Sequence, residues 1–262
     1  MVPDVTARPQ FLRVGRMWAF MTGAAVVAAV LATPLANVDH HSLTGHMVQH
    51  LVLMTLAAPL ILLGKPEIVW SRRPQDGLIH RLPVHHGQGQ ALSGDRRHDR
   101  HAIVGWCAGT ACVICWHVPS IFQLSLQSGG WHEVEQVTFL VAGLLFWRPV
   151  IEGWSTTAQW SIPVYLFLAT LPCDALAAFL AFCGRPVYSA YLHGPAGFSA
   201  ALLDQEVAGS MMWVWVTFAY LMPAVLVTIQ GLSHHEQSMR SSMSLAIANH
   251  RTTSPSSPTT GL

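Results

Sequence analysis

The sequence predicts an all-α membrane protein, a polytopic bundle of about six transmembrane helices with both termini in the cytoplasm. Of the 262 residues, 52% are hydrophobic and only 10% are charged, whereas a soluble domain has about 25% charged residues. The apolar residues cluster in stretches long enough to cross a bilayer, and nearly all basic residues fall on one side of the membrane. With a formal net charge of +1, the chain gives no indication of a nucleic-acid partner.

Six apolar stretches stand out by hydropathy, and each is near the ~17–25 residues that a helix needs to span the hydrocarbon core. Their cores cover residues 17–36, 47–63, 102–118, 134–151, 162–182 and 207–229. The first follows several arginines, as a secretory signal does, but it exceeds the ~7–15 apolar residues of such a signal. We therefore interpret it as a retained helix. The five cysteines are odd in number and lie in or beside these stretches, so they predict no disulfide framework.

The distribution of lysine and arginine predicts the orientation of the bundle. If the chain starts in the cytoplasm, 13 of its 14 basic residues fall on cytoplasmic segments, because only Arg185 lies on the other side. This agreement with the positive-inside rule places both termini in the cytoplasm.

We expect a single integral membrane domain over residues 1–232, with one long cytoplasmic loop at residues 64–101. The loop is basic, rich in glycine and histidine, and without a sustained hydrophobic period. Residues 233–262 are expected to form a disordered cytoplasmic tail, because they end in the sequence RTTSPSSPTTGL.

The second apolar stretch begins with two histidines one helical turn apart. In a helix, His46, His50 and Met54 share one face, with steps of about 6 Å between them. The i, i+4 spacing aims two imidazoles at one ion, although a histidine at a membrane interface also serves as a hydrogen-bonding anchor. Ionisable side chains are costly at membrane depth, so the pair marks a candidate site.

Further polar or sulfur-containing side chains are predicted at the same outer end of the bundle. They come from four other stretches and are His117, His132, Asp174, Asp204, Gln205 and Met212. Asp174 lies within the hydrocarbon zone and needs a partner. For Asp204 the alternative is to cap the sixth helix, and for Met212 it is packing in an apolar core.

The predicted donor set favours a soft metal. Imidazole and thioether in a partly dry cavity suit copper, above all Cu(I), better than Mg²⁺ or Ca²⁺, whereas zinc is expected to recruit carboxylates or thiolates. A haem iron held by His50 with His117 or His132 is an alternative. Covalent haem is not expected, because the histidine of CVICWH comes one residue too late for the attachment signature. The sequence has no G-x-S-x-G, H-E-x-x-H or P-loop motif, so we expect no enzyme.

Four segments carry a resemblance to a known family. They are HMVQHLVLMTLAAPLILLGKP, WHVP, EQVTFLVAGLLFWRPVI and DQEVAGSMMWV, in the second, third, fourth and sixth stretches. Over residues 40–232 the chain resembles the CtaG family of multi-pass bacterial cytochrome c oxidase assembly factors. The positions that match the family's motifs are His46, His50, Pro59, His117, His132, Trp147, Asp204, Gln205, Gly209, Met212 and Trp213.

The resemblance implies a protein of the bacterial plasma membrane that is needed to build an active haem–copper oxidase and helps copper reach it. Its implied partners are the cytochrome c oxidase subunits and the lipid bilayer. The chain departs from the family at Gln136, where a second histidine often follows the histidine of the fourth stretch, and in the 71–101 loop, which is unlike the usual short connection. Family members often have a seventh helix, which would precede the first stretch of this chain.

Residues and resemblance together lead us to expect an assembly factor that binds or passes copper without catalysing a reaction. The expected metal ligands are His46, His50, His117, His132, Met54 and Met212, the first two being primary. The residues expected to orient the imidazoles by hydrogen bonds are Asp174, Asp204 and Gln205. Two alternatives stay open: a membrane haem b protein that carries electrons, and a scaffold that binds oxidase subunits and no metal.

Overall fold

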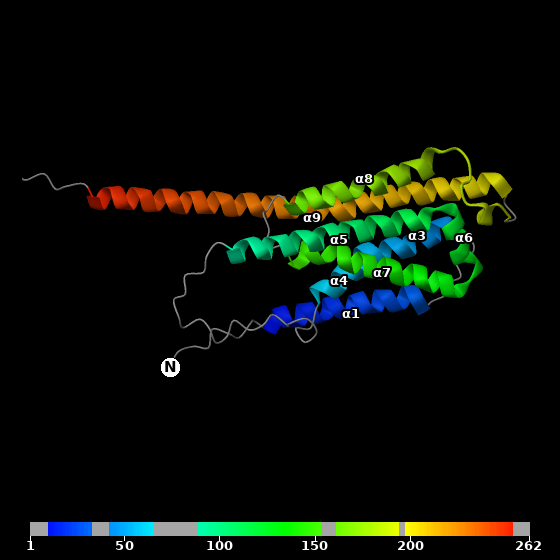
Figure 1. Cartoon of the computed structure of the whole chain (residues 1–262), viewed down its shortest axis with the longest axis horizontal. Helices are drawn as coiled ribbons and strands as arrows, with labels where there is room; N and C mark the ends of the chain where they lie inside the picture. The colour runs from blue at the N-terminus through cyan, green and yellow to red at the C-terminus, as the bar shows by residue number, and fades with distance from the viewer. Residues whose placement is uncertain (1–9, 33–41, 65–88, 153–160, 194–196, 254–262) are drawn as a thin grey trace, which may run out of the picture.

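The computed structural model describes residues 10–32, 42–64, 89–152, 161–193 and 197–253. All regular structure in these ranges is helical, and they contain no strand. The helices run back and forth along one long axis (Figure 1). The start of α1 and the end of α9 lie at one end of the bundle, and α6 lies at the opposite end.

The order of the elements follows the predicted stretches. They are α1 (Gln10–Ala32), α3 (Leu43–Val52), the π-helical turn η1 (Leu53–Ala57), α4 (Ala58–Leu63), α5 (Gly89–His117), α6 (Pro119–Gln127), α7 (Gly129–Glu152), α8 (Ser161–Phe182), the 3-10 turn η3 (Ser189–His193) and α9 (Gly197–Thr253).

Five described segments are long and apolar enough to cross a membrane: Val14–Leu31, Leu43–Leu63, Gly129–Glu152, Ser161–Phe182 and Gly197–Ser233. A sixth arises if Arg100–His117 and Pro119–Gln127, which meet at 76°, form one broken span. The break falls at Val118, which has an extended conformation because the residue before a proline avoids the helical region. The predicted helical membrane protein of about six spans is therefore confirmed.

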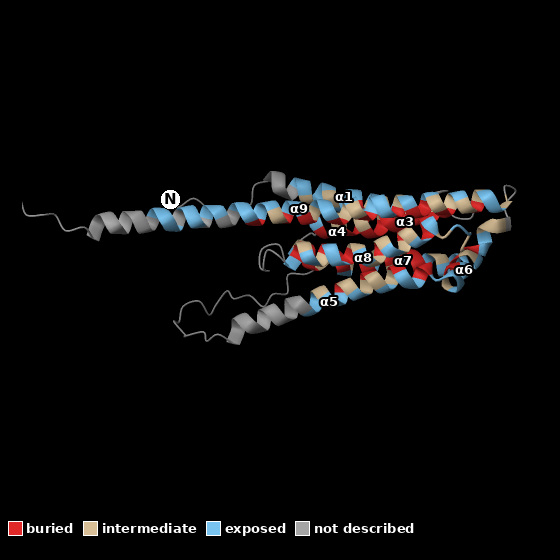
Figure 2. Ribbon diagram, turned by 90° about the horizontal axis from the view of Figure 1, so that it is seen from above, coloured by how far each residue is buried: buried red, intermediate tan, exposed pale blue. Residues whose placement is uncertain are grey.

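The outside of the bundle is apolar. Buried residues gather on the inner faces of the helices, and exposed residues cover the outer faces (Figure 2). Large side chains such as Phe167, Phe182 and Phe218 are 60–76% exposed. Extensive exposed apolar surface of this kind marks contact with lipid.

Close contacts between helices depend on two glycines. On α9, a Cβ at Gly209 would lie 2.8 Å from the Ala177 carbonyl oxygen of α8. On α7, a Cβ at Gly143 would lie 2.9 Å from both the Met54 carbonyl oxygen and Ala58 Cβ. Small residues allow backbones in a membrane bundle to approach this closely, which strengthens van der Waals packing.

The N-terminus of α3 is capped by a side chain from α9. The Asp204 carboxylate accepts hydrogen bonds from Leu43 N (2.6 Å), Thr44 Oγ1 (2.6 Å) and Ser42 Oγ (3.0 Å). A helix N-terminus has unpaired N–H groups and a partial positive charge, so a carboxylate is stabilising there. We expected Asp204 to cap its own helix or to orient an imidazole, but α9 already begins at Gly197, and the carboxylate joins α9 to α3 instead.

The expected long loop and the expected disordered tail each differ from the structure. The expected 64–101 loop is helical from Gly89, because no proline lies between Pro83 and His117 to stop α5; residues 65–88 lie outside the described ranges. The tail expected to be disordered from residue 233 is helical to Thr253. Pairs at i, i+4 such as Glu236 Oε1 with Arg240 Nη2 (2.7 Å) support this extension, and residues 254–262 lie outside the described part.

A Gly143→Ala substitution is expected to lower the free energy of unfolding by about 1–3 kcal/mol, because α7 must move away from η1 and α4. Thermal unfolding of the purified protein in detergent measures the change. The control is Gly130→Ala on the same helix, where the nearest atom is Ser128 Oγ at 3.8 Å from the added Cβ. Equal stability of the two variants would contradict the packing described here.

An Asp204→Ala substitution removes the hydrogen bonds to Leu43 N and Thr44 N, while Ser42 Oγ still accepts from Gly45 N. It is expected to lower the free energy of unfolding by about 0.5–2 kcal/mol. Glu206→Ala is the control, since Glu206 makes no hydrogen bond to the described part of α3. The same thermal assay applies. An Asp204→Ala protein as stable as Glu206→Ala would show that the cap contributes nothing.

Candidate functional site

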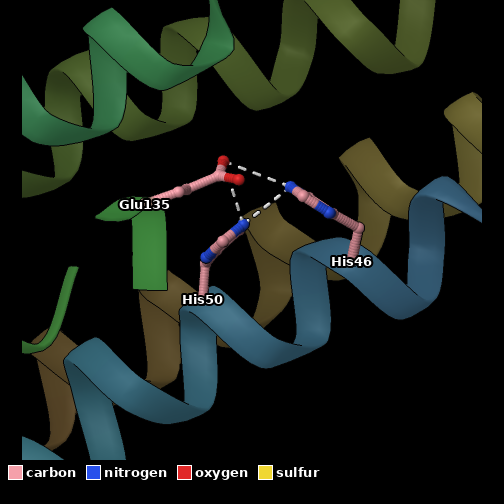
Figure 3. A group of neighbouring side chains, drawn as sticks. All are labelled: His46, His50 and Glu135. Carbon is pink, nitrogen blue, oxygen red and sulfur yellow. Dashed lines mark hydrogen bonds and ion pairs between the residues drawn. The ribbon is translucent and has the colours of Figure 1, made fainter. Parts of the chain in front are cut away.

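The candidate site lies where α3 and α7 begin and α5 ends, away from the start of α1 and the end of α9 (Figure 1). Helix α3 presents His46 and His50 one turn apart, and α7 presents Glu135 toward both of them (Figure 3). These are the three residues whose ligand atoms converge to within 4.8 Å of one another among the described histidines, cysteines and carboxylates. The structure thus adds a carboxylate to the predicted histidine pair.

The three donor atoms form a small triangle. His46 Nε2 lies 2.7 Å from His50 Nε2, and each of these nitrogens lies 3.2 Å from Glu135 Oε1. Donors that bind one ion at about 2.0–2.2 Å are separated from one another by roughly 3 Å. The triangle therefore has the dimensions of three ligands of a single metal ion.

The triangle is enclosed by protein. His46 and Glu135 are 0% exposed and His50 is 4% exposed. Within the described ranges, Glu135 Oε2 and His50 Nδ1 are buried without a hydrogen-bond partner. Burying polar atoms without partners costs free energy, and a bound cation would offset that cost for the carboxylate.

A hydrogen-bonded pair of amides orients His132 toward Glu135. Gln136 Nε2 donates to Gln49 Oε1 at 2.8 Å and to His132 Nε2 at 2.6 Å. An amide N–H only donates, so His132 Nε2 is the acceptor and the neutral ring carries its proton on Nδ1. That nitrogen lies 3.7 Å from Glu135 Oε2, so Gln136 fixes the ring that faces the triangle.

The π-helical turn η1 begins three residues after His50. In this turn Ala58 N donates to the Leu53 carbonyl oxygen, and Pro59, the next residue, has no N–H to offer the carbonyl of Met54. Trp147 Nε1 donates to that carbonyl at 2.9 Å instead. Such turns occur often at functional sites, and here the indole of α7 secures it.

His117 ends α5 with its ring held in one orientation. Its Nδ1 donates to the Val113 carbonyl oxygen at 2.6 Å, which leaves Nε2 as an unprotonated nitrogen in the neutral ring. Nε2 is buried and has no hydrogen-bond partner in the described part of the chain. The His117 carbonyl accepts from the Tyr188 hydroxyl at 3.1 Å, and burial raises the pKa of Tyr188 so that the phenol keeps its proton.

A small cavity of about 20 Å³ lies beside His50 and His117. The thioether residues Met54 and Met212 and the thiol residue Cys173 contribute to its lining. This volume accommodates one water-sized particle. The structure therefore places the predicted ligands other than His132 in two neighbouring sets that share His50: the triangle with His46 and Glu135, and the cavity with His117, Met54 and Met212. His132 lies beside the triangle, with its Nδ1 3.7 Å from Glu135 Oε2.

Two predicted residues lie away from the imidazoles. Asp174 is half-buried, and its Oδ1 has no hydrogen-bond partner among the described residues. Gln205 accepts from Val187 N at 2.6 Å and donates to the Leu180 carbonyl oxygen at 3.1 Å, which fastens the segment after α8. Asp204 likewise binds the N-terminus of α3 and not an imidazole. The contacts made by Gln205 and Asp204 therefore stabilise the fold around the site.

Glu135 was not among the predicted ligands. Two signals in the sequence point to it: it follows His132 at i, i+3, and it is an ionisable residue at the start of a membrane-spanning stretch. Its pairing with α3 depends on how the helices are arranged around the bundle, which a single sequence does not contain.

The chain matches the family described as cytochrome c oxidase caa3 assembly factor (Caa3_CtaG) over residues 2–233. Comparison with curated proteins and with solved structures found no match. The matched range includes the triangle, the cavity and every segment on which the resemblance was based. The chain therefore belongs to the family of cytochrome c oxidase caa3 assembly factors.

Proposed function

We propose that this protein assists the assembly of cytochrome c oxidase by binding copper at His46, His50 and Glu135 and passing it on at the extracytoplasmic face of the bacterial plasma membrane. In this role it hands over a metal and catalyses no reaction. The observation that carries the proposal is the convergence of three buried donor atoms at separations of 2.7–3.2 Å.

The donor set supports copper as the cargo. Sites built from nitrogen and oxygen donors bind divalent first-row metals in an order that peaks at Cu²⁺, and imidazole suits copper well. Zinc also accepts two histidines and a carboxylate. The membership in a family that assembles a haem–copper oxidase favours copper of the two.

The position of the site supports delivery outside the cytoplasm. It lies at the end of the bundle opposite the start of α1 and the end of α9 (Figure 1), and the positive-inside rule assigns those ends to the cytoplasm. Arg16 and Arg240 belong to these cytoplasmic ends. Metal bound by the triangle would therefore be close to the outer surface.

The available space favours an ion over haem. The cavity next to His50 and His117 measures about 20 Å³, whereas a porphyrin needs several hundred Å³ by comparison with ordinary ligand pockets.

A Glu135→Gln substitution is expected to lower the affinity for Cu²⁺ by about tenfold or more, because it removes the negative ligand while keeping the size of the side chain. Copper binding by the purified full chain in detergent, titrated against a competing chelator, measures the change. Glu133→Gln is the matched control: it lies two residues earlier on α7 and is exposed. If Glu135→Gln and a His46→Ala/His50→Ala protein bind copper as tightly as the wild type, the triangle is not the copper site. If the wild type itself binds no copper, the metal-free scaffold replaces this proposal.

Cells that lack the protein are expected to make the oxidase subunits but to have lower cytochrome c oxidase activity. Reintroducing the wild type or Glu133→Gln would restore the activity, whereas Glu135→Gln would not. Oxidase activity and immunodetection of the subunits in isolated membranes check this. Full oxidase activity in the deletion strain would contradict the assembly role. Full rescue by Glu135→Gln would show that the assembly role does not depend on the triangle.

A further inference from the structure

The cavity next to the triangle is lined by His117, whose Nε2 is a potential metal ligand. His117 is 8% exposed, and the bond from its Nδ1 to the Val113 carbonyl leaves the lone pair of Nε2 without a hydrogen-bond partner among the described residues. A buried acceptor left in this state costs free energy. A ligand that accepts electron density from Nε2 would remove that cost.

The other walls supply sulfur. Met54 comes from η1 and Met212 from α9, and both are buried, at 5% and 3% exposure. Besides the two histidines, the polar side chains of the lining are Thr55, Cys173 and Tyr220, and the remainder, including Val113, Phe139 and Val216, is apolar. Thioethers and imidazole in a dry setting are ligands for Cu(I), whereas Mg²⁺, Ca²⁺ and other hard ions require oxygen.

We propose that this cavity is a second metal position, specific for Cu(I), with His117 Nε2 and the thioether sulfurs of Met54 and Met212 as ligands. Its volume of about 20 Å³ holds one ion and little else. His50 lines the cavity and also supplies its Nε2 to the triangle, so the two positions are adjacent. The inference deepens the proposed copper role and rests on it for the choice of cargo.

The test compares Cu(I) and Cu²⁺ binding by the full chain in detergent. A Met54→Leu/Met212→Leu protein keeps the core volume and is expected to lose Cu(I) affinity about tenfold or more, with Cu²⁺ binding at the triangle unchanged. Glu135→Gln should show the reverse pattern. Met211→Leu is the control, since Met211 is adjacent in sequence but lines the groove between η1 and α9 and does not line the cavity.

The outcomes separate the two proposals. If the double variant binds Cu(I) with wild-type affinity, the proposed Cu(I) position in the cavity is wrong, regardless of how Glu135→Gln binds copper. If the double variant loses Cu(I) affinity and Glu135→Gln keeps its Cu²⁺ affinity, the result supports a Cu(I) position in the cavity and contradicts copper binding by the triangle. X-ray absorption at the copper edge gives an independent readout: sulfur in the wild-type Cu(I) shell, absent from the double variant, is expected, and a wild-type shell without sulfur overturns the inference.

Discussion

The packing of α3 against α7 depends on the contact of Glu135 with His46 and His50. A carboxylate that is 0% exposed inside an apolar helical bundle needs compensation, and two imidazoles at 3.2 Å supply it. They do so only if α3 and α7 meet with these faces opposed. The neighbouring side chains, including Gln136 with His132 and Gln49, keep that alignment through directed hydrogen bonds.

The backbone around this contact also favours the close approach of α7 to η1. Pro59 has no N–H, the turn before it is π-helical, and the carbonyl left over at Met54 is bound by Trp147. Gly143 lets α7 come close to this turn. These features explain why a proline, a glycine and a tryptophan far apart in the sequence act together: each allows or secures the approach of α7 to η1.

Much of the architecture follows from the sequence alone, because hydropathy and the i, i+4 spacing of His46 and His50 are local properties. The role of Glu135 and the α3 cap by Asp204 were not predictable in this way, since both depend on which helices are neighbours. Asp204 illustrates the limit: a carboxylate near a predicted helix start suits a cap, but the capped helix is 160 residues away along the chain. The helical parts of the expected loop and tail were missed because their polar composition indicated irregular structure, although neither part contains a proline that would stop a helix.

The assignment of Asp204 and Met212 to α9 has a consequence for biosynthesis. Helix α9 follows α3 in the chain, so during synthesis α3 enters the bilayer before the carboxylate that accepts from Leu43 N and Thr44 N has been made. Only after α9 has been inserted can the Asp204 carboxylate bind the N-terminus of α3 and the Met212 side chain reach the cavity beside His117. A chain that stops before α9 already contains His46, His50 and Glu135, but it lacks Asp204 and Met212. The two proposed copper positions would therefore be completed at different stages of synthesis.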